Sequence, residues 1–253
     1  MDKLKITGNF SRSAHLYDQY AEVQNKAASV LAGSLKENNF SRILELGCGT
    51  GNYTHLLRES FTDASITALD ISEEMIGVAQ NKLKNKAIEF IVADAEKITA
   101  DGDFDLITSN ACFQWLEDLK KALPRYAKLL RKKGTVCFSI FGPRTFWELN
   151  TALASVLKDG RAASAHFYNR DNLVAMLKCN FKSVKISEVC YQEDFSSLKG
   201  LLEKIKYSGI RGNGLNKSVY FSRGLLEKLE NAYRDRFQKI CVTYQVFFCS
   251  GEN

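Results

Sequence analysis

The feature that most constrains the fold is a glycine-rich turn directly behind a short apolar run. In the segment ILELGCGTGNYTH, residues 43–55, three glycines fall within five positions, at Gly47, Gly49 and Gly51. A turn of this kind between a strand and a helix is typical of nucleotide-binding loops. The spacing is GxGxG, however, whereas the dinucleotide fingerprint is GxGxxG. The turn therefore predicts a ligand site in an α/β fold without identifying the ligand.

Short β-branched or apolar runs alternate along the chain with longer segments of helical period. The candidate strands are residues 42–46, 65–70, 88–94, 104–110, 135–141, 183–192 and 240–249. The candidate helices between them are near residues 52–60, 73–84 and 116–131, with RKKG at 131–134 expected to cap the last of these. This alternation predicts βαβ units and an α/β fold with a doubly wound, mostly parallel, seven-stranded sheet. The direction of the last strand does not follow from the pattern.

Other segments lie outside the minimal sheet. Residues 9–36 have the period of an amphipathic helix or helix pair. Excursions of roughly 40 residues follow the fifth and sixth strands, at the edge where open α/β sheets bind ligands. We expect a single domain over 1–253, with a helical cap at 1–40, a binding core at 41–141, lid insertions at 142–182 and 193–239, and the last two strands at 183–192 and 240–250.

Composition excludes several classes of protein. Of the 253 residues, 45% are apolar, which is ample for a core. No stretch approaches about 18 uninterrupted apolar residues, and the N-terminus lacks the layout of a secretion signal. The seven cysteines are scattered without a CxxC pair, so neither a disulfide framework nor a metal site is expected. We expect a soluble, cytoplasmic protein without nucleic-acid or membrane partners.

Two acidic residues bear on which ligand the glycines hold. Asp70 ends the second strand, where it could bind the ribose of either NAD or S-adenosylmethionine. Glu45 ends the first strand and distinguishes the two, because a pyrophosphate about 4 Å away would be repelled by about 4 kcal/mol at an effective dielectric of about 20. S-adenosylmethionine has no phosphate and carries cationic groups. The alternative is that Glu45 is satisfied by helix amides or a nearby lysine.

Further strand ends extend this interpretation. Asp94 and Ala95 end the third strand, as an acceptor for the adenine amine and a small residue against the ring, and Asn110 ends the fourth. Through ELGCGTG, LDIS, ADAE and TSNACFQW, in order over residues 41–141, the sequence resembles the class I S-adenosylmethionine-dependent methyltransferases. The resemblance implies a Rossmann-like fold, S-adenosyl-L-methionine as cofactor, S-adenosyl-L-homocysteine as product and no metal. The cofactor-binding residues expected are Tyr17, Gln24, Glu45, Gly47, Cys48, Gly49, Gly51, Asp70, Ile71, Met75, Asp94, Ala95 and Asn110.

A second resemblance covers nearly the whole chain and concerns the methyl acceptor. FSRSAHLYDQYAEVQ, SNACFQWLEDL, FGPRTFWEL and SEVCYQEDF resemble the malonyl-acyl-carrier-protein O-methyltransferases of biotin synthesis, although residues 205–239 are less characteristic. The family implies esterification of the free carboxylate of a malonyl thioester. A carboxylate is ionised at neutral pH and needs no placed base, which agrees with the lack of an obvious one. The alternatives are a methyltransferase of a free small acid or other metabolite, a non-catalytic S-adenosylmethionine-binding partner protein and a dehydrogenase.

Roles can be suggested for six side chains. Tyr17 and Gln24 are two helical turns apart and share a face that could close over the methionine end of the cofactor. Arg144 could grip the substrate carboxylate, with a solvent-facing arginine as the alternative. The expected catalytic residues are Tyr17, Arg144 and His166, and the expected substrate-binding residues are Phe113, Trp115 and Arg144, with packing or solvent exposure as the alternative for each.

The charge of the chain is unevenly distributed. Residues 195–239 hold ten Lys and Arg against four Asp and Glu, a surplus of six that equals the net charge of the chain. Acyl carrier proteins are acidic. The segment 195–239 is therefore the expected docking surface for a carrier protein bearing malonyl-phosphopantetheine, and ordinary solvated helix faces are the alternative.

Overall fold

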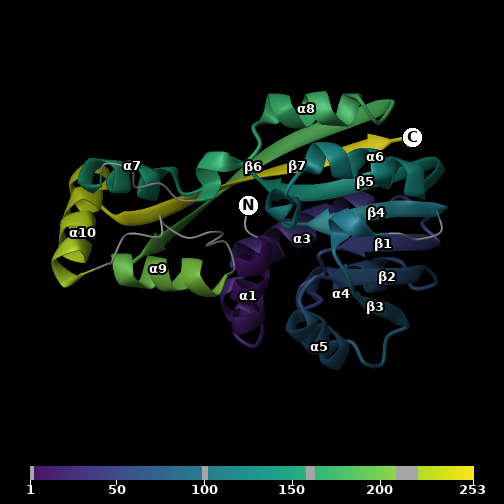
Figure 1. Ribbon diagram of the computed structural model, residues 1–253, viewed down its shortest axis with the longest axis horizontal. Coiled ribbons are helices and arrows are strands. Elements are labelled where there is room, and N and C mark those ends of the chain that lie inside the picture. Colours follow the sequence, from purple (N-terminus) through teal and green to yellow (C-terminus); the bar gives the residue numbers. More distant parts are fainter. Residues whose placement is uncertain (1–2, 99–101, 158–162, 209–221) are drawn as a thin grey trace.

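The computed structural model describes residues 3–98, 102–157, 163–208 and 222–253. Within these ranges the chain forms a seven-stranded sheet in the order β3-β2-β1-β4-β5-β7-β6 (Figure 1). The strands are β1 (Arg42–Leu46), β2 (Ser65–Asp70), β3 (Ile88–Val92), β4 (Phe104–Asn110), β5 (Leu130–Phe141), β6 (Ser183–Phe195) and β7 (Ile240–Glu252). Strands β1 to β5 pair in parallel, and β7 pairs antiparallel with both β5 and β6. The predicted mostly parallel, doubly wound sheet is confirmed, and the antiparallel direction of β7 is new.

Helices cover both faces of this sheet. They are α1 (Lys3–Ser13), α2 (Tyr17–Tyr20), α3 (Glu22–Leu35), α4 (Asn52–Ser60), α5 (Glu73–Lys82), α6 (Leu119–Leu129), α7 (Trp147–Val156), α8 (Arg170–Lys178), α9 (Leu198–Tyr207) and α10 (Arg223–Phe237), with short 3-10 turns η1 (Ala95–Lys97), η2 (Phe113–Trp115) and η3 (Ala163–His166). None of the helices in the described ranges is long and apolar enough to cross a membrane.

The central strands are apolar at nearly every position because helices cover both faces of the sheet. Ile43 and Leu106 share one buried cluster with side chains of α3 and α4. Their neighbours Leu44 and Ile107 point to the other face and share a second cluster with α6 and α8. Because alternate side chains of a strand point to opposite faces, a strand covered on both sides must be apolar at every position.

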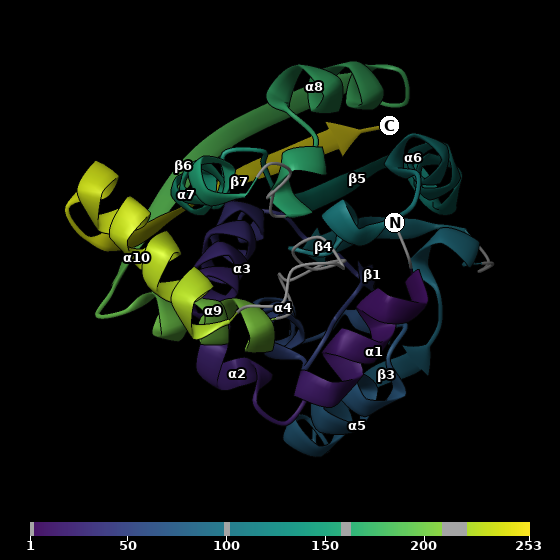
Figure 2. The same cartoon turned by 60° about the vertical axis from the view of Figure 1, so that its left-hand side comes forward.

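The N-terminal segment differs from the helix or helix pair expected over residues 9–36. It forms three helices, α1 to α3, and the first begins at Lys3. Helix α3 packs on the sheet, whereas α1 lies beside α5, close to the carboxyl ends of the strands (Figure 2). The short α2 connects them and packs against α9.

The two long excursions do not behave alike. Strands β6 and β7 have 13 residues each and extend beyond the rest of the sheet, and α7, α9 and α10 pack around this extension as an end lobe (Figure 1). Helix α8, from the first excursion, packs instead on β6 and β7 in the body of the sheet. Only part of residues 142–182 therefore belongs to the end lobe.

The expectation that residues 131–134 cap a helix is wrong. Helix α6 ends at Leu129, and RKKG belongs to the first half of β5. Leu130 is buried and pairs with Phe104, after which the register shifts before Leu106 pairs with Thr135. The chain enters the sheet early because Leu130 can be buried there, and the basic residues that follow stay exposed in the irregular part of the strand.

Candidate functional site

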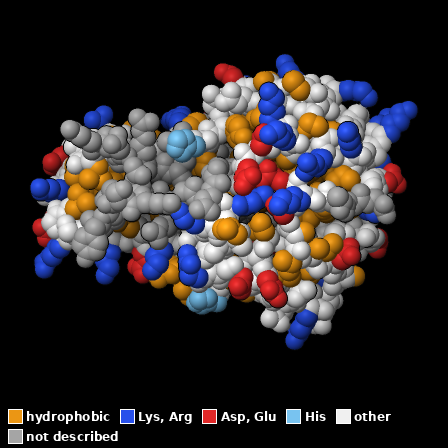
Figure 3. All heavy atoms as spheres, in the orientation of Figure 1, with side chains coloured by type: hydrophobic (Ala, Val, Ile, Leu, Met, Phe, Trp, Pro, Cys, Tyr) orange, Lys and Arg blue, Asp and Glu red, His pale blue; other side chains and the backbone are white. Residues whose placement is uncertain are grey.

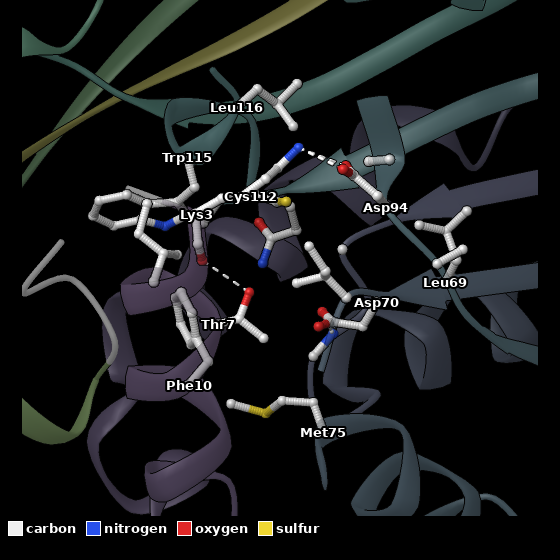
Figure 4. Close-up of a pocket in the computed structure, with 18 of the residues that line it drawn as sticks. Lys3, Thr7, Phe10, Leu69, Asp70, Met75, Asp94, Cys112, Trp115 and Leu116 are labelled. Carbon is white, nitrogen blue, oxygen red and sulfur yellow. Dashed lines mark hydrogen bonds and ion pairs between the residues drawn. The ribbon is translucent and has the colours of Figure 1, made fainter. Parts of the chain in front are cut away.

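A cavity lies at the carboxyl ends of the central strands, with α1 as its outer wall (Figure 4). Its floor comes from the glycine turn after β1, the ends of β2, β3 and β4, and the start of α5. The lining residues of the floor are Gly47, Gly49, Leu69, Asp70, Ile71, Met75, Ala93, Asp94, Ala95, Asn110, Ala111, Cys112, Trp115 and Leu116, together with Tyr17 of α2. Helix α1 adds Lys3, Ile6, Thr7 and Phe10. The chain thus brings most of the expected cofactor residues to one place.

The glycine turn is closely fitted to the rest of the site. Gly47, Gly49 and Gly51 have φ values of +73°, +55° and +83°, a region that L-residues with side chains rarely adopt. A Cβ on Gly47 would lie 2.3 Å from Sγ of Cys112. Gly51 is the N-cap of α4, packs near Ala79 and does not line the cavity. Gly47 and Gly49 therefore face the cavity, while Gly51 serves the strand-to-helix turn.

Asp70 connects the turn to the cavity. Its Oδ2 accepts a hydrogen bond from the Gly49 backbone N–H at 2.9 Å, and its Oδ1 accepts one from the Ser72 N–H at 2.9 Å. Burial raises the pKa of this carboxyl above its usual value, against the opposing effect of these backbone donors. The side chain points into the cavity (Figure 4). It can therefore hold a polar ligand group while it shapes the turn.

Glu45 lies in a smaller neighbouring cavity, lined also by Tyr17, Gln24 and Cys48. Its side chain is buried, and its Oε2 has no hydrogen-bond partner among the described residues. Burial raises the pKa of Glu45 to about 8, against a smaller lowering effect of Thr54, and the charge of the nearby Asp70 adds slightly to the rise. Burying an unpaired carboxylate is costly, and a cationic ligand group would offset that cost. A buried acid of this kind favours a cationic ligand group over an anionic one such as a pyrophosphate.

Asp94, at the end of β3, already has a partner from α1. The Lys3 Nζ lies 2.7 Å from both carboxylate oxygens of Asp94 (Figure 4). It also lies 2.6 Å from Oε2 of Glu96. Burial lowers the pKa of Lys3, but the hydrogen bonds to Asp94 and Glu96 outweigh it, and the pKa is raised. Ala95 is buried and lines the cavity next to this ion pair.

Tyr17 and Gln24 lie near one another at the boundary of the two cavities. Tyr17 lines both, and burial raises the pKa of its hydroxyl. The side-chain amide of Gln24 donates to the Ser208 backbone carbonyl at 3.0 Å, and the backbone carbonyl of Gln24 accepts from the Asn110 side-chain amide at 3.0 Å. The cap, the end of β4 and the end of α9 are thus joined through Gln24.

Asp18, next to Tyr17, fastens the short helix α2 onto the glycine turn. One carboxylate oxygen accepts from the Thr50 hydroxyl at 2.5 Å and from the Asn52 amide at 3.0 Å. The other oxygen is 2.6 Å from Lys82 Nζ. The position of Tyr17 over the cavity is therefore set by three contacts of its neighbour.

The residues expected to bind substrate are separated in the structure. Trp115 lines the cavity and packs edge-on against Phe10 and Phe167. Phe113, expected beside it, is instead fully buried in the core against Tyr126 and Phe138. The tight η2 turn sends these two aromatic side chains in different directions, and Phe113 is not in the cavity.

Arg144 and His166 are exposed and do not line the cavity either. Arg144 lies in the turn after β5, where its backbone N–H donates to Oε1 of Gln245 at 2.9 Å. His166 ends η3, and its neighbour Phe167 packs against Trp115. Arg144 is thus attached to β7 through Gln245, and neither side chain forms part of the described wall of the cavity.

The sequence did not indicate the contribution of α1. Lys3, Ile6, Thr7 and Phe10 all line the cavity, and they recur at intervals of three, one and three residues on one side of a helix. That spacing is a helical period and could have shown the face. The amphipathic pattern over residues 9–36 has its first apolar position at Phe10, so it does not reach the first two turns of α1.

The basic segment 195–239 is partly neutralised. Lys204 is paired with Glu193 at 2.6 Å and has a side-chain exposure of only 15%. Arg223, Arg234 and Lys239 are likewise paired with nearby acids. Among the described residues of the segment, the exposed cations without an acidic partner are Lys199, Lys206, Lys228 and Arg236. Lys and Arg side chains follow the edge of the end lobe (Figure 3), and Arg211 and Lys217 lie outside the described residues.

Comparison with known proteins gives relatives of two kinds. The family model for a methyltransferase domain matches residues 44–138. A malonyl-[acyl-carrier protein] O-methyltransferase of Bacillus cereus is 34% identical over 98% of this chain and 96% of its own length. The YcgJ protein of Bacillus subtilis has a TM-score of 0.64 at 16% identity over 90% of this chain and 98% of that chain. A phosphoethanolamine N-methyltransferase of Haemonchus contortus in complex with S-adenosylmethionine has a TM-score of 0.57 at 18% identity, over 95% of this chain and 57% of that chain.

Proposed function

We propose that this chain, which belongs to the malonyl-[acyl-carrier protein] O-methyltransferases, transfers a methyl group from S-adenosylmethionine to the free carboxylate of a malonyl group carried by acyl carrier protein. The observation that carries the cofactor assignment is the set of three carboxylates, Glu45, Asp70 and Asp94, at the ends of three strands around adjoining cavities. The proposal keeps the cytoplasmic location and the place in biotin synthesis that the resemblance implies.

Each carboxylate has a proposed partner on the cofactor. Asp70 binds the ribose hydroxyls, since it faces the cavity while its other contacts are to backbone N–H groups. Asp94 accepts from the adenine amine, with the buried Ala95 against the ring. Glu45, whose Oε2 has no partner in the described part of the chain, balances the positive charge of the methionine end. S-adenosylmethionine supplies a methyl group on a cationic sulfur, which the acceptor oxygen takes as the carbon–sulfur bond breaks.

The acceptor requires positioning and no proton removal. A malonyl carboxylate is ionised at neutral pH, so the protein has to align it and exclude water. Phe10, Trp115 and Phe167 form an aromatic group beside the cavity, which is suited to exclude water. We assign Arg144 to the acceptor carboxylate, because it is exposed on the turn that follows β5 at the same edge of the sheet. Tyr17 is assigned to the boundary between cofactor and acceptor.

The acidic carrier protein is proposed to dock on the end lobe. The attractive charge comes from exposed cations that have no acidic partner within the described ranges, namely Lys199 and Lys206 on α9 and Lys228 and Arg236 on α10. Lys204 is excluded from this role, because Glu193 and Glu22 already neutralise it.

The reaction itself is tested by incubating the protein with S-adenosylmethionine and each of three acceptors, namely malonyl carrier protein, malonyl-coenzyme A and free malonate, with mass spectrometry of the products. We expect a methyl adduct on the carrier-bound malonyl group. Faster methylation of free malonate would instead favour a small-acid methyltransferase. Calorimetric binding of the cofactor without turnover of any acceptor would favour a non-catalytic binding protein.

The docking surface is tested by charge reversal. The double variant Lys199→Glu, Lys206→Glu should raise the KM for malonyl carrier protein and leave the KM for malonyl-coenzyme A unchanged, since only the carrier is an acidic protein. The matched control is Lys178→Glu, Lys182→Glu, which reverses two exposed lysines near Asn253, at the other end of the sheet. Equal effects of the two double variants would place docking elsewhere.

A further inference from the structure

Helix α1 covers the outer side of the cofactor cavity and narrows it. Ile6 is buried, and Lys3, Thr7 and Phe10 complete the wall above Asp70, Asp94 and Met75 (Figure 4). The cavity that remains has a volume of about 90 Å³. Small-molecule sites usually offer roughly 300–1,000 Å³. A molecule with the bulk of S-adenosylmethionine therefore requires the wall to move outward before it can enter.

The ion pair of Lys3 uses the carboxylate that the proposed function assigns to adenine. Both oxygens of Asp94 lie 2.7 Å from Lys3 Nζ, and Oδ1 also accepts from the Glu96 N–H at 2.9 Å. A full positive charge is a stronger partner for a carboxylate than the neutral amine of adenine. As long as this ion pair is intact, Asp94 is engaged by the helix that closes the cavity.

The other end of α1 is attached through a hydrogen bond between two neutral groups. The Ser11 hydroxyl lies 2.9 Å from the Ser72 hydroxyl, which caps α5. Between the two attachments, Phe10 packs against Tyr17 and Trp115. Of these two attachments, that of Lys3 joins opposite charges, and that of Ser11 joins two neutral hydroxyls.

Glu96 provides a second carboxylate for the same lysine. Its Oε2 lies 2.6 Å from Lys3 Nζ and also accepts from the Glu117 N–H at 2.9 Å. Because Lys3 touches both acids, it can release Asp94 and keep Glu96. A short movement of one side chain is then enough to free the adenine acceptor while α1 stays near the site.

We propose that Lys3 is the latch of a cofactor gate formed by α1, and that it competes with the adenine amine for Asp94. With the site empty, Lys3 binds Asp94 and α1 closes the cavity. Entry of the cofactor displaces Lys3 from Asp94 onto Glu96 and moves α1 outward. Lys3 therefore sets both the rate of cofactor exchange and the affinity, and the inference rests on the proposed role of Asp94.

The test compares Lys3→Met with Lys97→Met. Lys97 is an exposed lysine next to Glu96, so its variant removes the same charge without touching Asp94. S-adenosylhomocysteine is the probe, since it lacks the sulfonium charge. For Lys3→Met we expect roughly three- to tenfold faster association by stopped-flow fluorescence and a correspondingly lower calorimetric Kd. We also expect faster hydrogen exchange of the α1 amides in the empty protein. Lys97→Met should match the parent in all three.

Two further variants separate the latch from the site. Ser11→Ala, which loosens the other attachment, should also speed association. Asp94→Asn should weaken binding. The latch alone would be overturned by two results together. In Lys3→Met, the association rate of S-adenosylhomocysteine and the hydrogen exchange of the α1 amides would both be unchanged, while Asp94→Asn would still bind the ligand more weakly. Unchanged affinity in Asp94→Asn would overturn the adenine assignment, and the competition with it.

Discussion

The carboxylate of Asp70 accepts a hydrogen bond at 2.9 Å from the backbone N–H of Gly49, 21 residues earlier in the chain. Gly49 lies in the glycine turn that follows β1, and Asp70 is the last residue of β2. Strands β1 and β2 pair in parallel. One acid therefore fixes the conformation of the turn and also faces the cavity that the turn helps to form. Loss of Asp70 should affect both.

Replacing Asp70 by Ala should weaken cofactor binding by about 1.5–3 kcal/mol, the usual scale of a hydrogen bond to a charged group. Asp70→Asn should lose less, since its amide oxygen can still accept from one of the two backbone N–H groups. Isothermal calorimetry with S-adenosylhomocysteine measures both. Asp63→Ala removes an exposed acid after α4 and serves as the control. If Asp70→Ala bound with unaltered affinity, the ribose would have to be held elsewhere.

Cofactor affinity should depend on pH through Glu45. Burial raises the pKa of this carboxyl to about 8 in the empty protein, so it is mostly protonated at pH 7. A cation bound beside it favours the ionised form and lowers the pKa, so binding releases a proton. The affinity for S-adenosylmethionine should therefore rise between pH 6 and pH 8, by at most about tenfold per unit, and level off above. Calorimetry across this range measures it. In Glu45→Gln this rise should disappear, and a rise of equal slope there would assign the proton to another group.

The sequence predicted the sheet and the acids of the site for the same physical reason. Strands covered on both faces are apolar throughout and can be recognised singly, and their polar ends, such as Asp70 and Asp94, must meet at one edge when the strands are parallel. The direction of β7 could not be predicted, because it is determined by pairing over seven positions with β5 and thirteen with β6. The local sequence of a strand does not determine which strands it pairs with.

The misplaced and missed residues share a cause as well. Lys3 and Asp94 are 91 residues apart, so the closure of the cavity by α1 depends on a contact that no spacing reveals. Phe113 and Trp115 are two residues apart, and the η2 turn alone decides which of them faces the core. Arg144 is fixed by Gln245, about a hundred residues later. These positions depend on contacts between distant parts of the chain or on one tight turn, and no local pattern in the sequence reveals them.

Gly47→Ala should destabilise the fold and abolish tight cofactor binding. The position has a φ of +73°, and a Cβ there would meet Sγ of Cys112 at 2.3 Å. The left-handed conformation alone costs about 1–2 kcal/mol for a residue with a side chain. Urea unfolding measures the loss. Gly33→Ala is the matched control, because Gly33 lies in α3 with nothing within 4 Å of the place that an added Cβ would take, and that variant should gain about 0.5–1 kcal/mol. Equal stabilities of the two variants would contradict the steric account.

The backbone of the turn that carries Arg144 is bound by one side chain, that of Gln245, at Arg144 itself. The side-chain oxygen Oε1 of Gln245 accepts from the Arg144 backbone N–H, and the backbone carbonyl of Gln245 accepts from the Gly142 N–H at 2.9 Å. Its amide also donates to Glu188 at 2.7 Å. Phe146, at the end of the turn, has a φ of +59°, a conformation that persists only when its surroundings impose it. Without the Gln245 amide, the Arg144 N–H loses its partner and the turn loses one of its constraints.

Gln245→Leu should therefore raise the KM for malonyl carrier protein by roughly tenfold, the equivalent of one lost hydrogen bond to a buried group, and leave the calorimetric Kd of the cofactor unchanged. The separation follows from geometry, since Gln245 touches the turn and not the cofactor cavity. The decisive measurement adds Arg144→Ala. If Gln245 acts by positioning Arg144, its loss should add nothing to the KM once the guanidinium is gone, so the two effects will not be additive. Additive effects, or an equal rise in the Kd of the cofactor, would show that Gln245 supports the fold generally and that Arg144 does not depend on it.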